Sequence, residues 1–212
     1  MMKRLLLIFL ALAILLPLAS CGDKDKDRQN EFLLTNEGYT DSETGVWYRC
    51  LPYAYEPVKS ADTRGVALYP DGTVRCTFLE MPDLDSKLWL CDDTRAVWYA
   101  GEWTVEPSTL TPRALLVCEE HSFSLERARL VQGTDDALIE EILSLWFTGA
   151  SVAEPAGQAT LTRRLRLVSA ELPGIYYCFD FYMVGEQGYF VDRMAARFVA
   201  LPDALGRTLA AY

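Results

Sequence analysis

Histidine and catalytic motifs are nearly missing from this sequence. His121 is the one histidine. There is no GxSxG, HExxH, phosphate-loop or dinucleotide-binding pattern, and no CxxC or Cys/His spacing typical of zinc. We therefore expect no cofactor and no metal, and no catalytic residue is indicated. Glu119-Glu120-His121 offers metal ligands or an acid–base pair, but an exposed polar turn is the simpler interpretation.

Positive charge is also scarce. The chain has 20 Lys and Arg against 30 Asp and Glu, a formal net charge of −10. Such a surface repels nucleic acid and anionic lipid head groups, so we expect no nucleic-acid partner. Half of the residues are apolar, which allows a real core in one domain or two small ones.

Long hydrophobic runs are absent except at the N-terminus. Met1–Arg4 is a cationic start, and the apolar run Leu5–Leu16 follows it. As a helix this run would be about 18 Å long, at about 1.5 Å per residue. The hydrocarbon core of a bilayer is about 30 Å thick. The run therefore fits the apolar region of a secretory signal peptide better than a spanning helix.

A cysteine closes this N-terminal segment. Leu18-Ala19-Ser20-Cys21 resembles the lipobox of bacterial lipoproteins, and the resemblance covers only about the first 21 residues. It implies that residues 1–20 are removed and that diacyl lipid on Cys21 holds the chain at the extracytoplasmic side of the cell membrane. In this class of lipoproteins, an aspartate directly after the lipidated cysteine retains the protein in the inner membrane. Residue 22 is glycine, so in a host with two membranes the outer membrane is also a possible location. The alternative is an ordinary signal peptide with a chance cysteine.

Residues 21–44 are predicted to be the lipid anchor and a flexible tether. Asp23–Arg28 alternates charge and offers nothing to bury. The spacing of its aspartates resembles the start of a calcium-binding loop, but Arg28 stands in place of the turn glycine and Leu34 in place of the bidentate glutamate, so we reject calcium binding.

Five further cysteines cannot all pair within one chain, and we expect mostly buried thiols with at most one or two disulfides. They are Cys50, Cys76, Cys91, Cys118 and Cys178.

Residues 45–212 are predicted to form a single β-rich domain of the α+β class. It would be a mainly antiparallel sheet built from successive hairpins, with one amphipathic helix at about 135–147 and a short C-terminal helix, Asp203–Ala211. The first hairpin turns at Pro70-Asp71-Gly72 and should pair Leu68 with Val74 and Val66 with Cys76, all on one face. The other predicted strand pairs are Leu88–Cys91 with Ala96–Trp103, Ala114–Cys118 with Phe123–Val131, and, after the strand Leu161–Ser169, Ile175–Val184 with Tyr189–Leu201.

The last of these hairpins carries the candidate binding site. A tight turn over residues 185–188 would place Asp180 directly opposite Arg193. The face that they share combines aromatic and charged side chains: Tyr176, Asp180, Tyr182, Arg193 and Arg197. Arginines on an otherwise acidic protein can grip a carboxylate or a phosphate. The competing interpretation is an ordinary solvated outer face.

Three functions follow, in order of preference. The first is a non-catalytic binding or interaction lipoprotein of the cell envelope, whose partner is an envelope protein, a peptide or a glycan. The second is an envelope hydrolase that uses carboxylates, for which acids from different strands must converge in a cleft. The third is a structural or assembly component, which predicts an exposed apolar patch or an open strand edge.

Overall fold

A computed structural model describes residues 30–119, 129–131 and 136–212 of the chain. The described strands are β1 (Asn30–Leu34), β2 (Gly38–Asp41), β3 (Trp47–Cys50), β4 (Tyr55–Pro57), β5 (Thr63–Leu68), β6 (Val74–Glu80), β7 (Trp89–Asp92), β8 (Val97–Tyr99), β9 (Pro112–Glu119), β10 (Arg129–Val131), β11 (Leu161–Ser169), β12 (Ile175–Val184), β13 (Gln187–Asp192) and β14 (Arg197–Ala200). The described helices are η1 (Pro107–Thr109), α2 (Asp136–Thr148) and α3 (Asp203–Ala211). None of them is long and apolar enough to cross a bilayer.

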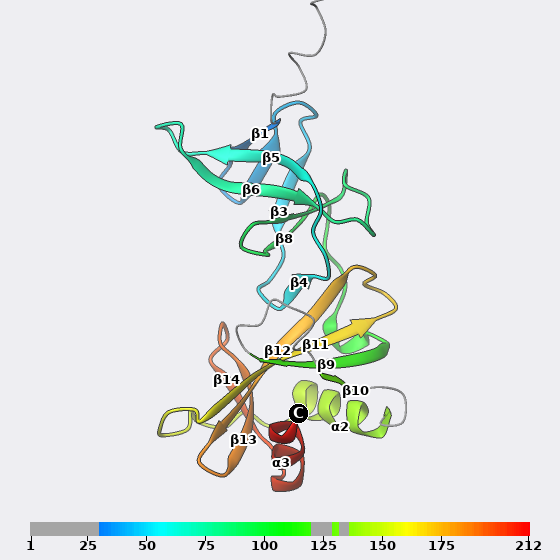
Figure 1. The fold of residues 1–212 in the computed structure, drawn as a ribbon, viewed down its shortest axis with the longest axis vertical. Helices are drawn as coiled ribbons and strands as arrows, with labels where there is room; N and C mark the ends of the chain where they lie inside the picture. Colours follow the sequence, from blue (N-terminus) through cyan, green and yellow to red (C-terminus); the bar gives the residue numbers. More distant parts are fainter. Residues whose placement is uncertain (1–29, 120–128, 132–135) are drawn as a thin grey trace, which may run out of the picture.

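The N-terminal half forms a closed barrel, with strand order β1-β2-β3-β8-β7-β6-β5 (Figure 1). Parallel pairing of β1 with β5 closes it, through Asn30 with Gly65 and Glu31 with Val66. A side chain at Gly65 would collide with the Asn30 carbonyl oxygen, so closure there requires glycine. The barrel interior is filled by Phe32, Tyr39, Tyr48, Ala67, Cys76, Phe78 and Leu90.

The C-terminal half forms a second sheet, in the order β10-β9-β11-β12-β13-β14. One edge of the long strand β12 is shared by two partners, because residues 175–177 pair with β4 and residues 180–184 pair with β13. Strand β4 lies between β3 and β5 in the sequence, and both of those belong to the barrel. The chain therefore leaves the barrel, adds a strand to the second sheet and returns (Figure 1).

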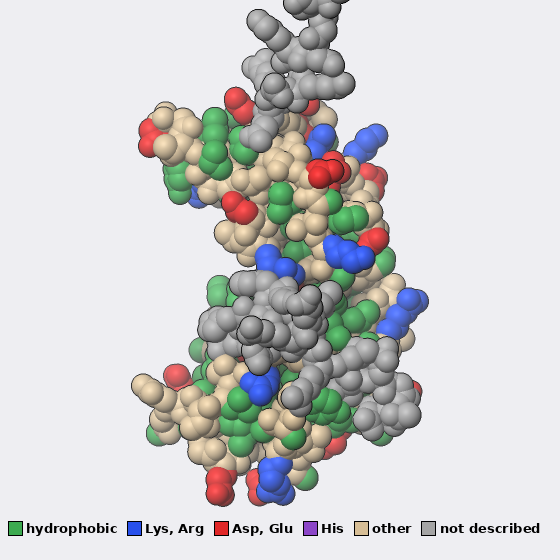
Figure 2. Space-filling view, in the orientation of Figure 1, with side chains coloured by type: hydrophobic (Ala, Val, Ile, Leu, Met, Phe, Trp, Pro, Cys, Tyr) green, Lys and Arg blue, Asp and Glu red, His purple; other side chains and the backbone are tan. Residues whose placement is uncertain are grey.

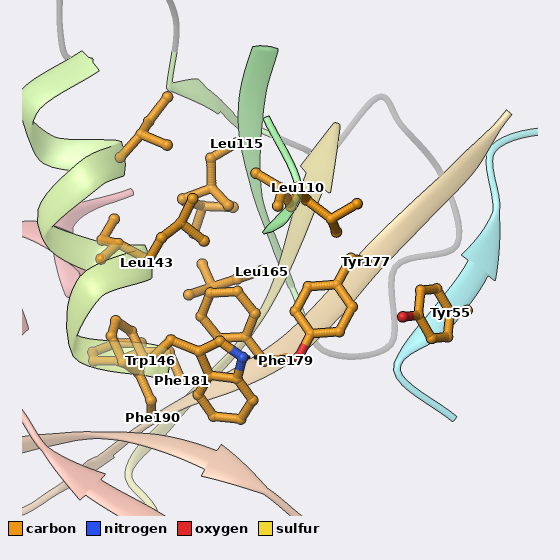
Figure 3. Packing of buried hydrophobic residues seen from close by; sticks show 14 of the residues in the cluster. Tyr55, Leu110, Leu115, Leu143, Trp146, Leu165, Tyr177, Phe179, Phe181 and Phe190 are labelled. Carbon is orange, nitrogen blue, oxygen red and sulfur yellow. Dashed lines mark hydrogen bonds between the residues drawn. The ribbon is translucent and has the colours of Figure 1, made fainter. Parts of the chain in front are cut away.

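Helix α2 covers one face of the second sheet and builds the main core with it (Figure 3). The Trp146 ring stacks on Phe179 with centroids 4.6 Å apart, and its indole N–H donates to the Tyr177 hydroxyl at 2.9 Å. Helix α3 packs against β13, where Gly206 approaches Gly188 closely. Stacking and hydrogen bonding together fix the C-terminal part of α2 on the sheet.

The predicted class is right only in its coarse form. The protein is mainly β with two α-helices among the described residues, but it has a closed barrel and a second sheet rather than one sheet of successive hairpins. The tether prediction is wrong for residues 30–34 and 38–41, which form β1 and β2. Alternation of charge ends at Arg28, so the tether signal itself stops before these strands begin.

Several predicted elements are confirmed. Strand Leu161–Ser169 and helix Asp203–Ala211 have the predicted bounds, and the helix predicted at 135–147 spans Asp136–Thr148. In the first hairpin Leu68 does pair with Val74, but a bulge after Ala67 places Cys76 opposite Ala67 and not Val66. In the next, Cys91 pairs with Val97. In the third, β10 pairs with β9, and the predicted turn lies largely outside the described residues.

The predicted register of the last hairpin is wrong by two residues. Gly185, at φ 62°, closes a tight turn, so Val184 pairs with Gln187 and Asp180 lies opposite Val191. A shift of two residues keeps every β12 side chain on its predicted face. The second strand is also broken, because residues 193–196 turn and β14 begins at Arg197.

Candidate binding site on the buried arginine–carboxylate network

Five charged side chains meet on the face of the second sheet opposite α2. Glu56 comes from β4, Arg164 and Arg166 from β11, Asp180 from β12, and Arg193 from the turn after β13. We call them the arginine–carboxylate network. The β11–β12 register places Arg164 beside Asp180, and the β12–β4 register brings Glu56 next to Tyr176. Strand pairing alone therefore gathers residues more than 100 positions apart in the sequence.

Each carboxylate of the network bridges two guanidiniums. The two Glu56 oxygens accept from Arg164 Nε and Arg166 Nε, both at 2.9 Å. Asp180 accepts from Arg164 at 2.8 Å and from Arg193 Nε at 2.7 Å. The chain of charges thus runs from Arg166 through Glu56, Arg164 and Asp180 to Arg193. Charge-assisted hydrogen bonds of this length are about twice as strong as neutral ones.

Most of the network is removed from water. The side chains of Arg164, Arg166 and Asp180 are only 3–7% exposed, whereas that of Arg193 is 41% exposed. Burial alone would raise the pKa of Glu56, but Arg164 and Arg166 outweigh it and hold that pKa below its ordinary value. Burial raises the pKa of Asp180, and the Arg164 guanidinium works against that rise. The exposed end of the network is therefore a cation.

Two buried thiols flank the network on either side of β11. Cys118 lies opposite Arg164 in the β9–β11 pair, and Cys178 lies opposite Arg166 in the β11–β12 pair. Arg166 donates to Cys118 Sγ at 3.3 Å. Burial raises the pKa of both thiols, that of Cys178 far above its ordinary value, and the arginines only partly oppose this. Both cysteines are neutral packing residues at physiological pH.

Tyr53 lies at the mouth of this site, in the loop between β3 and β4. The residue is 61% exposed, and the Arg164 guanidinium carbon lies 4.9 Å from the centroid of its ring. Two hollows lie beside the loop and share Pro52 and Tyr53. The smaller, about 80 Å³, is lined by Asp180 and Arg193 among others.

The larger hollow has a volume of about 340 Å³ and we call it the junction cleft. It lies where the barrel meets the second sheet, because residues of the β7–β8 turn line one side and residues 50–56 the other. Arg95 of that turn donates to the Pro57 carbonyl oxygen at 2.7 Å. The complete lining is Cys50, Leu51, Pro52, Tyr53, Tyr55, Glu56, Thr94, Arg95 and Ala96. The cleft thus combines aromatic walls with a few fixed polar groups.

The network is built to hold position rather than to transfer protons. All four carboxylate oxygens of Glu56 and Asp180 accept hydrogen bonds from arginine. A general acid or base must present its oxygen to the substrate, at about 2.6–3.2 Å. In the structure these oxygens contact guanidiniums instead.

The structure brings together three of the five candidate residues that were chosen from the sequence. Asp180 and Arg193 form the 2.7 Å ion pair, and Arg193 lies over the Tyr182 ring with 5.4 Å to its centroid. Tyr176 is buried beneath Arg166. Arg197 is elsewhere: it pairs with Asp192 and donates to the carbonyl oxygens of Trp146 and Gly149 at the end of α2. Its expected place on the same face is wrong, because the turn before β14 reverses the alternation.

Sequence reasoning missed four residues of this site, namely Tyr53, Glu56, Arg164 and Arg166. The two arginines alternate with Leu165 and Leu167, a pattern that normally marks a solvated face. In the structure all four positions are buried, and the arginines contact Glu56 of β4 and the Tyr53 carbonyl oxygen of the loop before it. Two arginines so close together on one strand indicate that carboxylates lie nearby. The carboxylate that pairs with both is Glu56, and it could not be identified because strand β4 was not predicted.

The remaining acidic side chains and the cysteines either have structural roles or lie outside the described residues. Asp92 accepts from Thr94, Ala96 and Trp98, so it organises a turn. Glu140 is exposed on α2, and His121 lies outside the described residues. Within the described part of the chain no three His, Cys, Asp or Glu side chains gather as metal ligands. The five cysteines there are free, four of them buried and Cys50 exposed.

No protein-family model, no curated protein and no solved structure matches this chain. Its function must therefore be inferred from the geometry of the site itself.

Proposed function

We propose that this protein is an exported lipoprotein, anchored by lipid on Cys21, whose body is a non-catalytic binding module of the cell envelope. The ligand occupies the junction cleft and contacts Tyr53. The cationic start, the short apolar run and the lipobox support the location. The cleft supports the binding role, because its volume lies at the lower end of the range of small-ligand sites.

The exposed Tyr53 ring above buried Arg164 is the observation that carries the binding role. A large, exposed aromatic side chain normally loses conformational freedom when it binds a ligand. Here one ring face already lies against a guanidinium that two carboxylates hold in place. The opposite face of the ring is left for stacking on a ligand. Because the arginine already restricts the ring, binding costs less conformational entropy.

The expected ligand has a flat face and several hydrogen-bonding groups. A sugar ring or a peptide side chain can stack on Tyr53, while Glu56 and Arg95 line the same cleft. The hydrolase alternative requires Glu56 or Asp180 to leave its arginine partners, and the paired geometry argues against it. An interaction with an envelope glycan or peptide is therefore the function we propose.

Ligand screening of the mature protein tests this proposal. Glycan fragments and short peptides would be titrated against the wild type, and any ligand found would then be titrated against Tyr53→Ala. We expect a loss of at least about tenfold in affinity, as for stacked aromatic anchors. Tyr69→Ala is the matched control, because Tyr69 is also an exposed tyrosine paired with an arginine, on the barrel hairpin. Equal affinities for all three proteins would refute the cleft as the binding site.

A further inference from the structure

Five of the nine large apolar side chains that are exposed in the described part of the chain gather at one end of the barrel. Their exposed fractions run from 39% to 55%. They are Leu33, Leu34, Leu68, Tyr69 and Val74, and we call them the barrel-tip patch. Figure 2 shows apolar surface beside the tip of the β5–β6 hairpin, at the far end of the molecule from α3.

Strand pairing makes these five residues neighbours. Leu68 pairs with Val74 across the hairpin, and the Tyr69 N–H donates to the Thr73 carbonyl oxygen in the turn. The parallel pair Glu31–Val66 precedes Leu33 and Leu68 by two residues each, which brings those leucines to the same end of the barrel. The patch therefore spans strands β1, β5 and β6.

Nothing in the fold of the described chain requires these side chains to be apolar. The barrel core is complete without them, because Phe32, Ala67 and Cys76 fill the inward positions next to them. The bulge after Ala67 turns Leu68 outward. A contiguous cluster of exposed apolar side chains is typical of a surface that contacts a membrane or a partner.

We infer that the barrel-tip patch inserts into the surface of the bilayer that holds the Cys21 lipid; this inference rests on the proposed lipidation. Only nine peptide steps separate Cys21 from Asn30, where β1 begins. An extended chain gains at most about 3.6 Å per residue, so the start of β1 stays within about 32 Å of the anchored cysteine. Leu33 and Leu34 end that same strand of five residues, so the patch stays within reach of the bilayer at high effective concentration.

The chemistry of the patch suits the interface between lipid and water. Tyr69 carries an apolar ring with a polar tip, and tyrosine is enriched at that depth in membrane proteins. The guanidinium of Arg75 lies 5.4 Å from the Tyr69 ring centroid, at the level where lipid phosphates would be. Because the chain as a whole is acidic, the attraction is expected to come from apolar insertion rather than from net charge.

Docking by this patch also orients the molecule. The barrel and the second sheet lie at opposite ends of the long axis (Figure 1). With the barrel tip in the bilayer, the second sheet points away from it and the junction cleft stays open to soluble ligands. Lipid contact and ligand binding thus use different surfaces.

Hydrogen exchange on the acylated protein in phosphatidylcholine vesicles tests the inference. We expect amides of residues 68–75 to exchange about tenfold more slowly on vesicles than in the body released by proteolysis before residue 30. In Leu68→Ser/Tyr69→Ser this protection should disappear. Val152→Ser/Met194→Ser is the matched control, because these exposed apolar residues belong to the second half of the chain. It should keep the wild-type protection.

This design tests the lipidation of Cys21 and the docking of the barrel-tip patch separately. Mass spectrometry of the same sample reports whether Cys21 carries acyl chains. If it does not, the chain is coupled through the Cys21 thiol to maleimide lipid, in a Cys50→Ser background, and the exchange is repeated. Equal exchange at residues 68–75 in tethered and released protein overturns the docking inference, whatever the natural anchor is. Protection that survives the double serine change also overturns it.

Discussion

Replacing Glu56 by alanine should cost the protein much of its stability. Glu56 accepts two 2.9 Å hydrogen bonds from two arginines whose side chains are at most 7% exposed. Its removal leaves Arg166 without its Glu56 contact and Arg164 with one carboxylate partner fewer. Breaking a buried ion pair by removing one partner costs about 3–5 kcal/mol. Because Glu56 itself is 15% exposed, we expect the lower end of that range.

The size of this loss can be read from thermal and urea unfolding. For a chain of this length, 1 kcal/mol shifts the Tm by roughly 2–4 °C, so Glu56→Ala should lower it by about 6–12 °C. Glu56→Gln keeps one acceptor oxygen and the volume, and it should lose about half as much. Arg193→Ala removes a partly exposed partner and should cost only about 1 kcal/mol.

Two controls make this prediction refutable. Glu102→Gln makes the same change as Glu56→Gln at an exposed glutamate, and it should leave the Tm unchanged. A double-mutant cycle of Glu56→Ala with Arg166→Met measures their coupling, which we expect to exceed about 1 kcal/mol. The reasoning is refuted if Glu56→Ala costs no more than Glu102→Gln, or if the coupling is zero.

Three further predictions concern acid, thiols and barrel closure. The arginines hold the folded-state pKa of Glu56 below 4.5, so its stabilisation is fully present above that pH and is lost as the pH falls through the folded value. The difference in stability between wild type and Glu56→Gln, measured by urea unfolding, should therefore be constant above pH 4.5 and shrink as the pH is lowered further. Among the five described cysteines of the native protein, Cys50 should react fastest with a thiol reagent because it is exposed, although burial raises the pKa of its thiol; Cys178 should not react, and Cys50→Ser should remove the fastest phase. Gly65→Ala should destabilise the protein by about 1–3 kcal/mol in urea, because its methyl group meets the Asn30 carbonyl oxygen; an unchanged midpoint would contradict this closure.

Local patterns in the sequence predict individual elements well. The apolar spacing at residues 138–147 is enough to place α2, because a helix of that length shows its buried stripe directly. Strand Leu161–Ser169 is equally visible from its alternation. The contact between Asp180 and Arg193 was also anticipated, although it arises across a turn and not from the predicted register.

Long-range pairing could not be derived from those patterns. Barrel closure depends on two parallel residue pairs between β1 and β5, for which no turn or alternation exists. The site depends on β4, a strand of three residues. Tyr53 and Glu56 contact the β11 arginines, so both faces of that strand are buried and the leucine–arginine alternation no longer marks a solvated face. A solvated face and a buried ion network therefore share one local sequence pattern.

Because β4 joins the second sheet between two barrel strands, the protein cannot be divided simply into fragments. The chain passes from barrel to sheet before β4, back again after it, and across once more after β8. Excising the barrel alone would strip β12 of its neighbour at residues 175–177 and take Glu56 away from Arg164 and Arg166. Keeping residues 30–57 with the sheet would instead open the barrel. The two halves are distinct in architecture yet inseparable by any single cut.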